Sequence, residues 1–325
     1  MTSHATDNRA LAAILVLTAI GLASSQDAVM KAMSSSYPVY ETLMIRGLTS
    51  VPILGFWLAR KHGAQALFTP YWPRVLLRSL ILFSAYLAFV LSIAAMPIAN
   101  MVSIYFTMPF FVAGLAGPFL GERVPLHRWI AIVVGFIGVI IMVRPGAQAF
   151  EPASLLALYS AFGYAIGQMM GRKLSQHVPP LVIANWQNGI YLGSALAIGL
   201  IVHVTGFSSE ANKSLAFLTR PFAWPTLQDF VLMTSVGVLI AFAMVCFINA
   251  YRLAESNYVA AFEYSGMVWA VLFGLLFFND FPDLWTWGGM TVVAGAGLFM
   301  LAMDRLKFQT AKPAQAFTVR SASDD

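Results

Sequence analysis

Four ionisable side chains lie inside long apolar stretches of the sequence. A charge there costs free energy, and such residues usually have a functional or structural role. The four are Asp27, Glu41, Arg46 and Glu263. A charge at the centre of a membrane-spanning helix costs about 2.5–3.5 kcal/mol on insertion scales. We predict that Arg46 pairs with Asp27, and more loosely with Glu41, either as an outer gate or as an ion pair that holds two helices together. Glu263 is predicted to bind a substrate amino group or to carry a proton; the alternative is pairing with Arg252 or capping of the backbone.

Amides and aromatic rings at mid-membrane depth form the second group of candidates. An apolar cavity with a few polar groups suits an organic solute with a large apolar part, and buried tyrosines need partners for their hydroxyl groups. The predicted substrate-binding residues are Gln26, Tyr86, Tyr105, Tyr164, Gln168, Trp186, Asn188, Asn249, Glu263 and Tyr264. The alternative for each amide is a hydrogen bond between helices, which averages about 0.6 kcal/mol in membranes. Each ring could equally serve packing or face lipid.

Two further features bear on how these side chains are held. Pro109 lies in the middle of an apolar run, where it removes a backbone hydrogen bond and bends a helix, and Gly266 holds the corresponding place in a later run. We predict that both are hinges, although a static kink is equally compatible. A stripe of small residues at Gly163, Gly167 and Gly171 favours close contact with another helix. Gln168 is rotated about 100° from that stripe, toward the expected cavity.

Other classes of chemistry lack the residues they need. The histidines fall in tails, loops or helix ends, at His4, His62, His127, His177 and His203. The single cysteine, Cys246, excludes a disulfide or a cysteine-based metal site within one chain. No Walker motif is present, which argues against a nucleotide-driven pump. The like charges that form rings in channel pores are not visible in the sequence either, which argues against a channel. We therefore predict no catalytic residues, no metal and no cofactor.

The elements that position the candidates follow from composition. Hydrophobic residues make up 59% of the chain and charged residues only 10%, whereas a soluble domain carries about 25% charged residues. Apolar runs long enough to span a bilayer, about 20 residues each, fall near 10–32, 39–59, 75–95, 98–120, 128–143, 153–171, 181–204, 227–251, 258–278 and 284–303. The sequence predicts an all-α polytopic membrane protein with ten transmembrane helices.

Basic residues predict the orientation, because cytoplasmic segments of membrane proteins are enriched in Lys and Arg. With the N-terminus inside, fourteen lie on the cytoplasmic side: Arg9, Arg60, Lys61, Arg74, Arg78, Arg123, Arg128, Arg172, Lys173, Arg252, Arg305, Lys307, Lys312 and Arg320. Four lie outside: Lys31, Arg144, Lys213 and Arg220. Both termini are expected in the cytoplasm, with the protein in the inner membrane. The net charge of +5 marks no nucleic-acid site, since the basic residues form no patch interleaved with aromatic ones.

The chain repeats itself with a shifted offset. An offset of 142 aligns Gly21, Gln26, Lys31, Pro38 and Gly47 with identical residues, and an offset of 157 aligns Asn100, Gly117, Pro125 and Gly138 with theirs. The predicted units are 1–147, 148–304 and a disordered cytoplasmic tail, 305–325. Five helices per unit is an odd number, so the two units are inverted relative to each other. Inverted repeats are common in secondary transporters, where the substrate site lies near the midplane between the halves.

The stretch from Ala94 to Val143 carries Pro97, Ala99, Pro109, Gly121, Glu122, Gly135, Gly138 and Val139. It resembles the EamA repeat of the drug/metabolite transporter superfamily, and the second copy keeps Asn257, Gly274, Pro282 and Gly295. That copy departs from the pattern at Gly266 and at Asn279-Asp280. The resemblance covers nearly the whole chain and implies a central cavity, with the fifth and tenth helices peripheral. In general character the chain is similar to YddG-type aromatic amino acid exporters.

Together these features predict a secondary transporter that exports amino acids, aromatic or large and apolar ones favoured, or related metabolites by alternating access. Uptake of a metabolite such as S-adenosylmethionine is the main rival, and a scaffold or channel is a weaker one. The expected partners are a small-molecule substrate and the lipid bilayer. The sequence leaves open the substrate, the direction, coupling to protons, and whether the protein is a monomer or a weak dimer.

Overall fold

The computed structural model describes residues 9–120, 124–144, 151–253, 259 and 262–320, and every regular element among them is helical. The first half contains α1 (Arg9–Met33), α2 (Val39–His62), the 3-10 helix η1 (Ala64–Leu67), α3 (Trp72–Ala95), α4 (Ile98–Tyr105), α5 (Met108–Leu120) and α6 (Leu126–Val143). The second contains α7 (Ala153–Leu174), α8 (Pro180–Thr205), α9 (Lys213–Thr219), α10 (Leu227–Leu253), α12 (Ser265–Phe278) and α13 (Leu284–Arg320).

Eight helical segments among the described residues are long and apolar enough to cross a bilayer: α1, α2, α3, the α4–α5 stretch, α6, α8, α10 and α13. The two remaining apolar runs, 153–171 and 258–278, correspond to the 22-residue α7 and to the shorter apolar α12. Leucine, isoleucine, valine and phenylalanine cover the outside of these helices, as lipid-facing surfaces require. The chain is a polytopic all-α membrane protein, as predicted.

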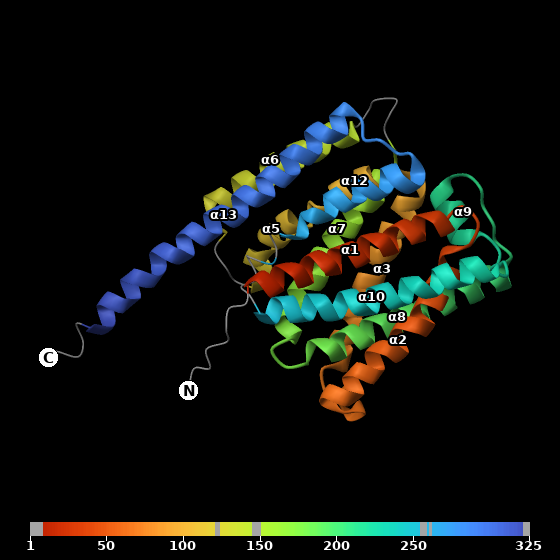
Figure 1. Cartoon of the computed structure of the whole chain (residues 1–325), viewed down its shortest axis with the longest axis horizontal. Helices are drawn as coiled ribbons and strands as arrows, with labels where there is room; N and C mark the ends of the chain where they lie inside the picture. The colour runs from red at the N-terminus through yellow and green to blue at the C-terminus, as the bar shows by residue number, and fades with distance from the viewer. Residues whose placement is uncertain (1–8, 121–123, 145–150, 254–258, 260–261, 321–325) are drawn as a thin grey trace.

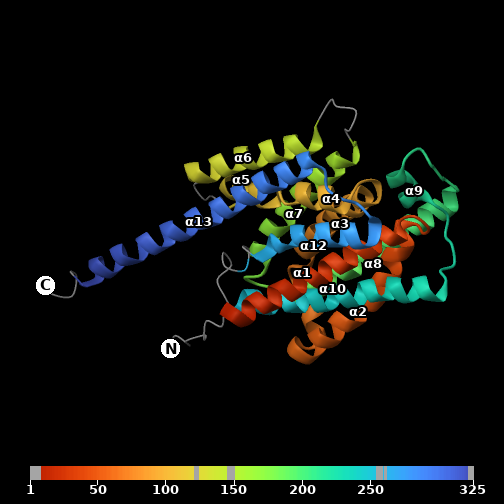
Figure 2. The ribbon, with the colours of Figure 1, turned by 45° about the horizontal axis from the view of Figure 1, so that its top comes forward.

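The main helix contacts of the bundle recur between the corresponding helices of the repeat. α1 packs along α10, and their repeat mates α7 and α3 pack along each other. α2 contacts α10 while its mate α8 contacts α3. Repeat mates also contact each other directly: α2 with α8, α6 with α13, and α4 of the fourth span with α12 of the ninth span. This pattern is that of two related halves around a twofold axis, and it leaves α6 and α13 side by side at the edge of the bundle (Figures 1 and 2).

Glycines allow the closest of these approaches. A methyl group at Gly163 would lie 2.8 Å from Cβ of Ala85, and one at Gly167 would lie 2.4 Å from the Leu82 side chain. The predicted small-residue stripe on α7 therefore faces α3. At the edge of the bundle, a methyl group at Gly289 would meet the carbonyl oxygen of Gly138 at 2.6 Å, so α13 and α6 touch backbone to backbone.

The fourth and ninth spans are interrupted rather than bent. α4 ends at Tyr105, Phe106 and Thr107 form a turn, and α5 starts at Met108. In the second half Glu263 is helical, Tyr264 forms a turn and α12 starts at Ser265. The repeat offset of 157 relates the two breaks. Paired interruptions of this kind in the two halves are a pointer to the binding site of a transporter.

These breaks correct the predicted hinge geometry. Pro109 and Gly266 are not in the middle of helices; each is the second residue of the helix that follows a break. The first turn of a helix accepts proline because its amide groups lack partners within the helix. In the first half the interruption covers the residues directly before Pro109, which cannot donate a backbone hydrogen bond to Tyr105.

Both ends of the described chain lie at one end of the bundle, here called the termini end, while α9 and its flanking loops lie at the other, here called the α9 end (Figure 1). α13 differs from the prediction for the tail, because it continues as helix past Asp304 to Arg320. The alanines, lysines and glutamines of the stretch from Asp304 to Arg320 favour helix, whereas Pro313 within it does not. The predicted Gly121-Glu122 helix end lies outside the described residues.

Candidate functional site

A cavity of about 860 Å³ lies in the centre of the bundle and is lined from both halves. Its lining includes Asp27 on α1 and Phe89 on α3, which lie within the span of the bundle. Another part of the lining comes from Arg172 at the end of α7, Ser175 in the following loop and Pro180 at the start of α8. Because α7 ends and α8 begins at the termini end, the cavity runs from the midplane toward that end.

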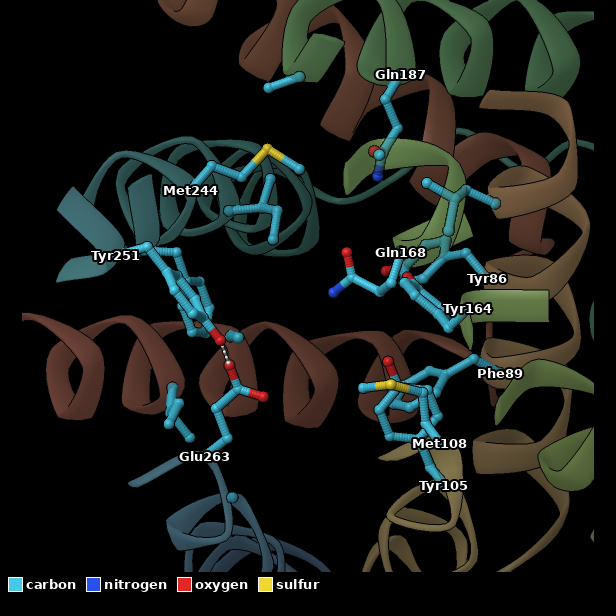
Figure 3. A pocket seen from close by; sticks show the side chains of 18 of the residues that line it. Tyr86, Phe89, Tyr105, Met108, Tyr164, Gln168, Gln187, Met244, Tyr251 and Glu263 are labelled. Carbon is cyan, nitrogen blue, oxygen red and sulfur yellow. Dashed lines mark hydrogen bonds between the residues drawn. The ribbon is translucent and has the colours of Figure 1, made fainter. Parts of the chain in front are cut away.

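Seven of the ten predicted substrate-binding residues line this cavity: Gln26, Tyr86, Tyr105, Tyr164, Gln168, Glu263 and Tyr264. Both predicted hinge residues line it as well. In Figure 3 the amide of Gln168 points into the open space, with Tyr251 and Glu263 on one side and Tyr86 and Tyr164 on the other. No hydrogen bond occupies this amide within the described part of the chain, so it is available to a ligand.

The aromatic side chains form a continuous wall on one side of the cavity. Tyr105 meets Phe89 and Tyr164 edge to face, with ring centroids 5.3 Å apart in both pairs. Tyr86 stacks on Tyr191 at 5.4 Å. Edge-to-face and offset pairs are the preferred arrangements of aromatic rings. The wall offers ring faces and edges to a flat solute.

The two helix breaks meet in the same place. Phe106 stacks on Tyr264 with ring centroids 5.2 Å apart, and these residues come from the interruptions of the fourth and ninth spans. Glu263, next to the second break, accepts a hydrogen bond from the hydroxyl of Tyr251 (Figure 3). The breaks thus bring an aromatic contact and a carboxylate to the centre of the bundle.

Three predicted residues lie outside the cavity lining. Trp186 donates its indole N–H to the carbonyl oxygen of Leu67 in η1, at 3.0 Å. Asn188 accepts a hydrogen bond from Ser50 and so joins α8 to α2. The amide of Asn249 donates to Val245 of its own helix at 2.9 Å. The structure places these side chains in helix packing, because the rotation of α8 and α10 turns them away from the central space.

The predicted grouping of charges in the first two helices is also different. Within the described residues Arg46 makes no ion pair with Asp27 or Glu41. Its guanidinium carbon lies 4.6 Å from the ring centroid of Tyr86. Asp27 accepts a hydrogen bond from Gln26 at 3.0 Å. Glu41 accepts one from the backbone N–H of Ala223, outside the cavity.

Sequence reasoning missed several lining residues. Arg78 was assigned to a cytoplasmic segment, but it is buried and donates to the carbonyl of Gly167 at 3.0 Å and to Gln187 at 3.1 Å. Tyr191 donates its hydroxyl to the carbonyl of Leu82. The position of Arg78 inside the apolar run was a usable signal, whereas Tyr191 and Tyr251 carried none.

The α9 end is closed by polar contacts between segments from both halves. Lys31 on α1 forms an ion pair with Asp280 at 2.8 Å and also donates to the carbonyl of Met96. Arg144 pairs with Asp283 at 2.6 Å. Tyr37 donates to the Asp229 carboxylate at 2.7 Å, and this hydrogen bond raises the pKa of Tyr37.

We expect loss of the Lys31–Asp280 ion pair to open the α9 end. Lys31→Met removes the charge, and the rate at which an impermeant thiol reagent added on the α9 side labels an Ala23→Cys, Cys246→Ser protein should rise about fivefold, equivalent to about 1 kcal/mol. Ala23 lines the cavity, so its labelling reports access to it. Lys173→Met, at the repeat mate, is the control and should change nothing. Unchanged labelling of the Lys31 variant would show that the pair does not close this end.

No group of three or more histidine, cysteine, aspartate or glutamate side chains that could hold a metal occurs within the described ranges. What the site offers is instead a ring-lined space with free hydrogen-bonding groups, which suits reversible binding of an organic molecule. Its volume lies within the roughly 300–1,000 Å³ of small-molecule sites.

Comparison with known proteins agrees with this description. The model of the EamA-like transporter family matches the chain twice, over residues 10–144 and 152–303. A riboflavin transporter of Rhizobium johnstonii is 31% identical over 254 residues, covering 78% of this chain and 76% of that protein. An S-adenosylmethionine uptake transporter of Rickettsia bellii is 24% identical, covering 87% and 90%. A pseudopaline exporter of Pseudomonas aeruginosa is also 24% identical, covering 87% and 92%.

A crystal structure with 17% sequence identity superposes with a TM-score of 0.60 and covers 90% of this chain and 97% of its own, which shows that the fold is shared. The two family matches lie within the predicted units 1–147 and 148–304, whose limits stay a prediction. None of these relatives is named as an amino acid exporter, so the likeness to YddG-type exporters is not specifically supported.

Proposed function

Because the chain belongs to the EamA-like transporter family, it is a multi-pass membrane transporter, and we propose that it carries an organic solute with a flat ring system through the central cavity. The observation that carries this proposal is the aromatic wall formed by Phe89, Tyr105 and Tyr164, beside which the amide of Gln168 extends into the cavity with no hydrogen-bond partner among the described residues (Figure 3). Flat rings stack on such a wall, while the amide and the nearby carboxylate of Glu263 bind polar substituents.

The named relatives support a solute of this kind. Riboflavin contains a fused three-ring system, and S-adenosylmethionine contains an adenine ring. Both relatives are transporters by name. An aromatic amino acid, favoured by the sequence, has the same combination of a ring and polar groups. We propose that the ring is the shared requirement and that flavin-like and purine-like solutes are stronger candidates than amino acids.

In alternating access the cavity is exposed to each side of the membrane in turn, and the concentration gradients of the solute and of any coupled ion set the direction of net transport. The cavity reaches the termini end, and the excess of basic residues in segments at that end supports a cytoplasmic location. We propose an inner-membrane protein with cytoplasmic termini that is open to the cytoplasm in this structure. Such a state can release an imported solute or bind one for export, which fits relatives named for uptake and for export.

Counterflow in proteoliposomes tests the proposal without assuming a direction. Vesicles loaded with unlabelled solute would be tested with labelled riboflavin, S-adenosylmethionine, tryptophan and alanine. Exchange of at least one ring-bearing solute, with none of alanine, is the expected result. A folded protein that exchanges no ring-bearing solute would overturn the proposal.

We also expect Gln168→Ala to slow that exchange about 2- to 10-fold, because one hydrogen bond to the solute, worth about 0.5–1.5 kcal/mol, is lost. Asn249→Ala is the matched control, since the Asn249 amide bonds to its own helix outside the cavity. Equal rates for the two variants would remove Gln168 from the binding site.

A further inference from the structure

The cavity lining contains a buried cation, Arg46, that forms no ion pair with any residue the structure describes. The Arg46 side chain is only 3% exposed, and its Nε has no hydrogen-bond partner among the described residues. Its guanidinium carbon lies 4.6 Å from the ring centroid of Tyr86 and 5.4 Å from that of Tyr191. Cation–π contact compensates part of the loss of water, but a buried charge normally needs a paired and hydrogen-bonded partner.

Acceptors lie beside this cation but do not neutralise it directly. Gln26 is 2% exposed and donates its amide to Asp27 at 3.0 Å and to the Tyr86 hydroxyl at 3.2 Å. The carbonyl oxygen Oε1 of Gln26 has no hydrogen-bond partner in the part of the chain that the structure describes. Tyr86 therefore joins the two sides, since its hydroxyl binds Gln26 and its ring lies against Arg46. Asp27 lines the same cavity as Arg46 but forms no ion pair with it within the described structure.

We propose that Arg46, Asp27 and Gln26 form a polar subsite that binds a group of the transported solute carrying a hydrogen-bond acceptor next to a donor. The acceptor binds the Arg46 guanidinium, whose fork of N–H groups suits two oxygen lone pairs. The donor binds the Asp27 carboxylate or the free Gln26 oxygen. All three residues line the cavity, so the subsite can be reached by a solute whose ring lies on the aromatic wall. The inference rests on the proposed function and adds the polar end of the substrate to it.

Two solute chemistries present this edge. An α-amino carboxylate places an anionic acceptor beside an ammonium donor, and the imide edge of a flavin ring places carbonyl acceptors beside an N–H donor. Either chemistry would supply hydrogen-bond partners to the Arg46 guanidinium and the Gln26 carbonyl oxygen at the same time. A solute with only an acceptor or only a donor would leave one buried group unpaired, which is the usual origin of strong discrimination in a polar site.

Paired probes test the subsite on the purified full-length protein. Tryptophan is compared with tryptamine, which lacks the carboxylate, and with indole-3-propionate, which lacks the ammonium; riboflavin is compared with 3-methylriboflavin, whose imide N–H is blocked. In the parent protein, the intact member of at least one set should bind at least tenfold more tightly than its altered analogues. In Arg46→Lys and Asp27→Asn that preference should fall below threefold, with the melting temperature retained as a sign of folding.

Glu41→Gln is the matched control, because this buried carboxylate bonds to the Ala223 amide outside the cavity; its preference should equal that of the parent. If the tryptophan set shows the tenfold preference, the subsite binds an α-amino carboxylate; if the riboflavin set shows it, the subsite binds a flavin imide edge. The subsite is overturned if the parent binds intact and altered probes alike, or if both variants keep the full preference. If the parent binds no probe and exchanges no ring-bearing solute in counterflow, it is the proposed function that fails.

Discussion

Glu263→Gln is expected to reduce solute exchange about 10- to 100-fold while leaving the protein folded. The carboxylate lines the cavity beside the break in the ninth span and accepts a hydrogen bond from Tyr251. A hydrogen bond between a solute and a charged group contributes about 1.5–3 kcal/mol, and each 1.4 kcal/mol corresponds to a factor of ten. Glutamine keeps the size and the acceptor for Tyr251 but removes the charge. Counterflow rates at matched protein content give the measurement.

The control for this prediction is Glu41→Gln, which removes a buried carboxylate outside the cavity and should change the exchange rate less than threefold. Tyr251→Phe removes only the hydroxyl that donates to Glu263, so its effect should lie between those of the two glutamine variants. Exchange at the parental rate by the Glu263 variant would show that this carboxylate has only a packing role.

Gly237→Leu should abolish most of the folded protein. A methyl group at this position of α10 would lie 2.5 Å from the carbonyl oxygen of Arg46 and 2.6 Å from Cβ of Thr49. Both atoms belong to α2, and one of them is backbone, so no rotamer change relieves the clash. Overpacking of this kind typically costs about 1–3 kcal/mol, occasionally more. Thermal unfolding and the monodisperse yield after detergent extraction would measure the loss.

Gly193→Leu is the matched control, since a methyl group at Gly193 would meet nothing within 4 Å. We expect its yield and unfolding temperature to stay near those of the parent. The α2–α10 contact would be less tight than described if the two leucine variants behaved alike.

The architecture could be predicted from the sequence because its causes are local or periodic. A run of apolar residues predicts a membrane helix wherever it occurs, and the shifted offset that aligns Gln26 with Gln168 predicts a duplicated unit. The spacing of Gly163 and Gly167 predicted a helix contact, and α3 makes it. These features need no knowledge of which helix lies next to which.

The membership of the site was predicted less completely. Gln168 could be placed because a neighbouring glycine stripe fixed the rotation of its helix. No such reference existed for Trp186, Asn188 or Asn249, and the rotation of α8 and α10 directs them into helix contacts instead. Polarity alone does not distinguish an amide that faces a cavity from one that joins two helices.

The sequence by itself determined that the protein is a duplicated, all-helical membrane protein, because hydropathy and repeat spacing depend only on the order of residues. It also showed that ionisable residues lie inside the apolar runs. Only the tertiary structure decided what those charges meet. Arg46 lies against the rings of Tyr86 and Tyr191 instead of a carboxylate, and the breaks next to Tyr105 and Glu263 lie at one centre. Both outcomes depend on packing between separate helices: Tyr86 comes from α3, Tyr191 comes from α8 in the other half, and the two breaks lie in different halves.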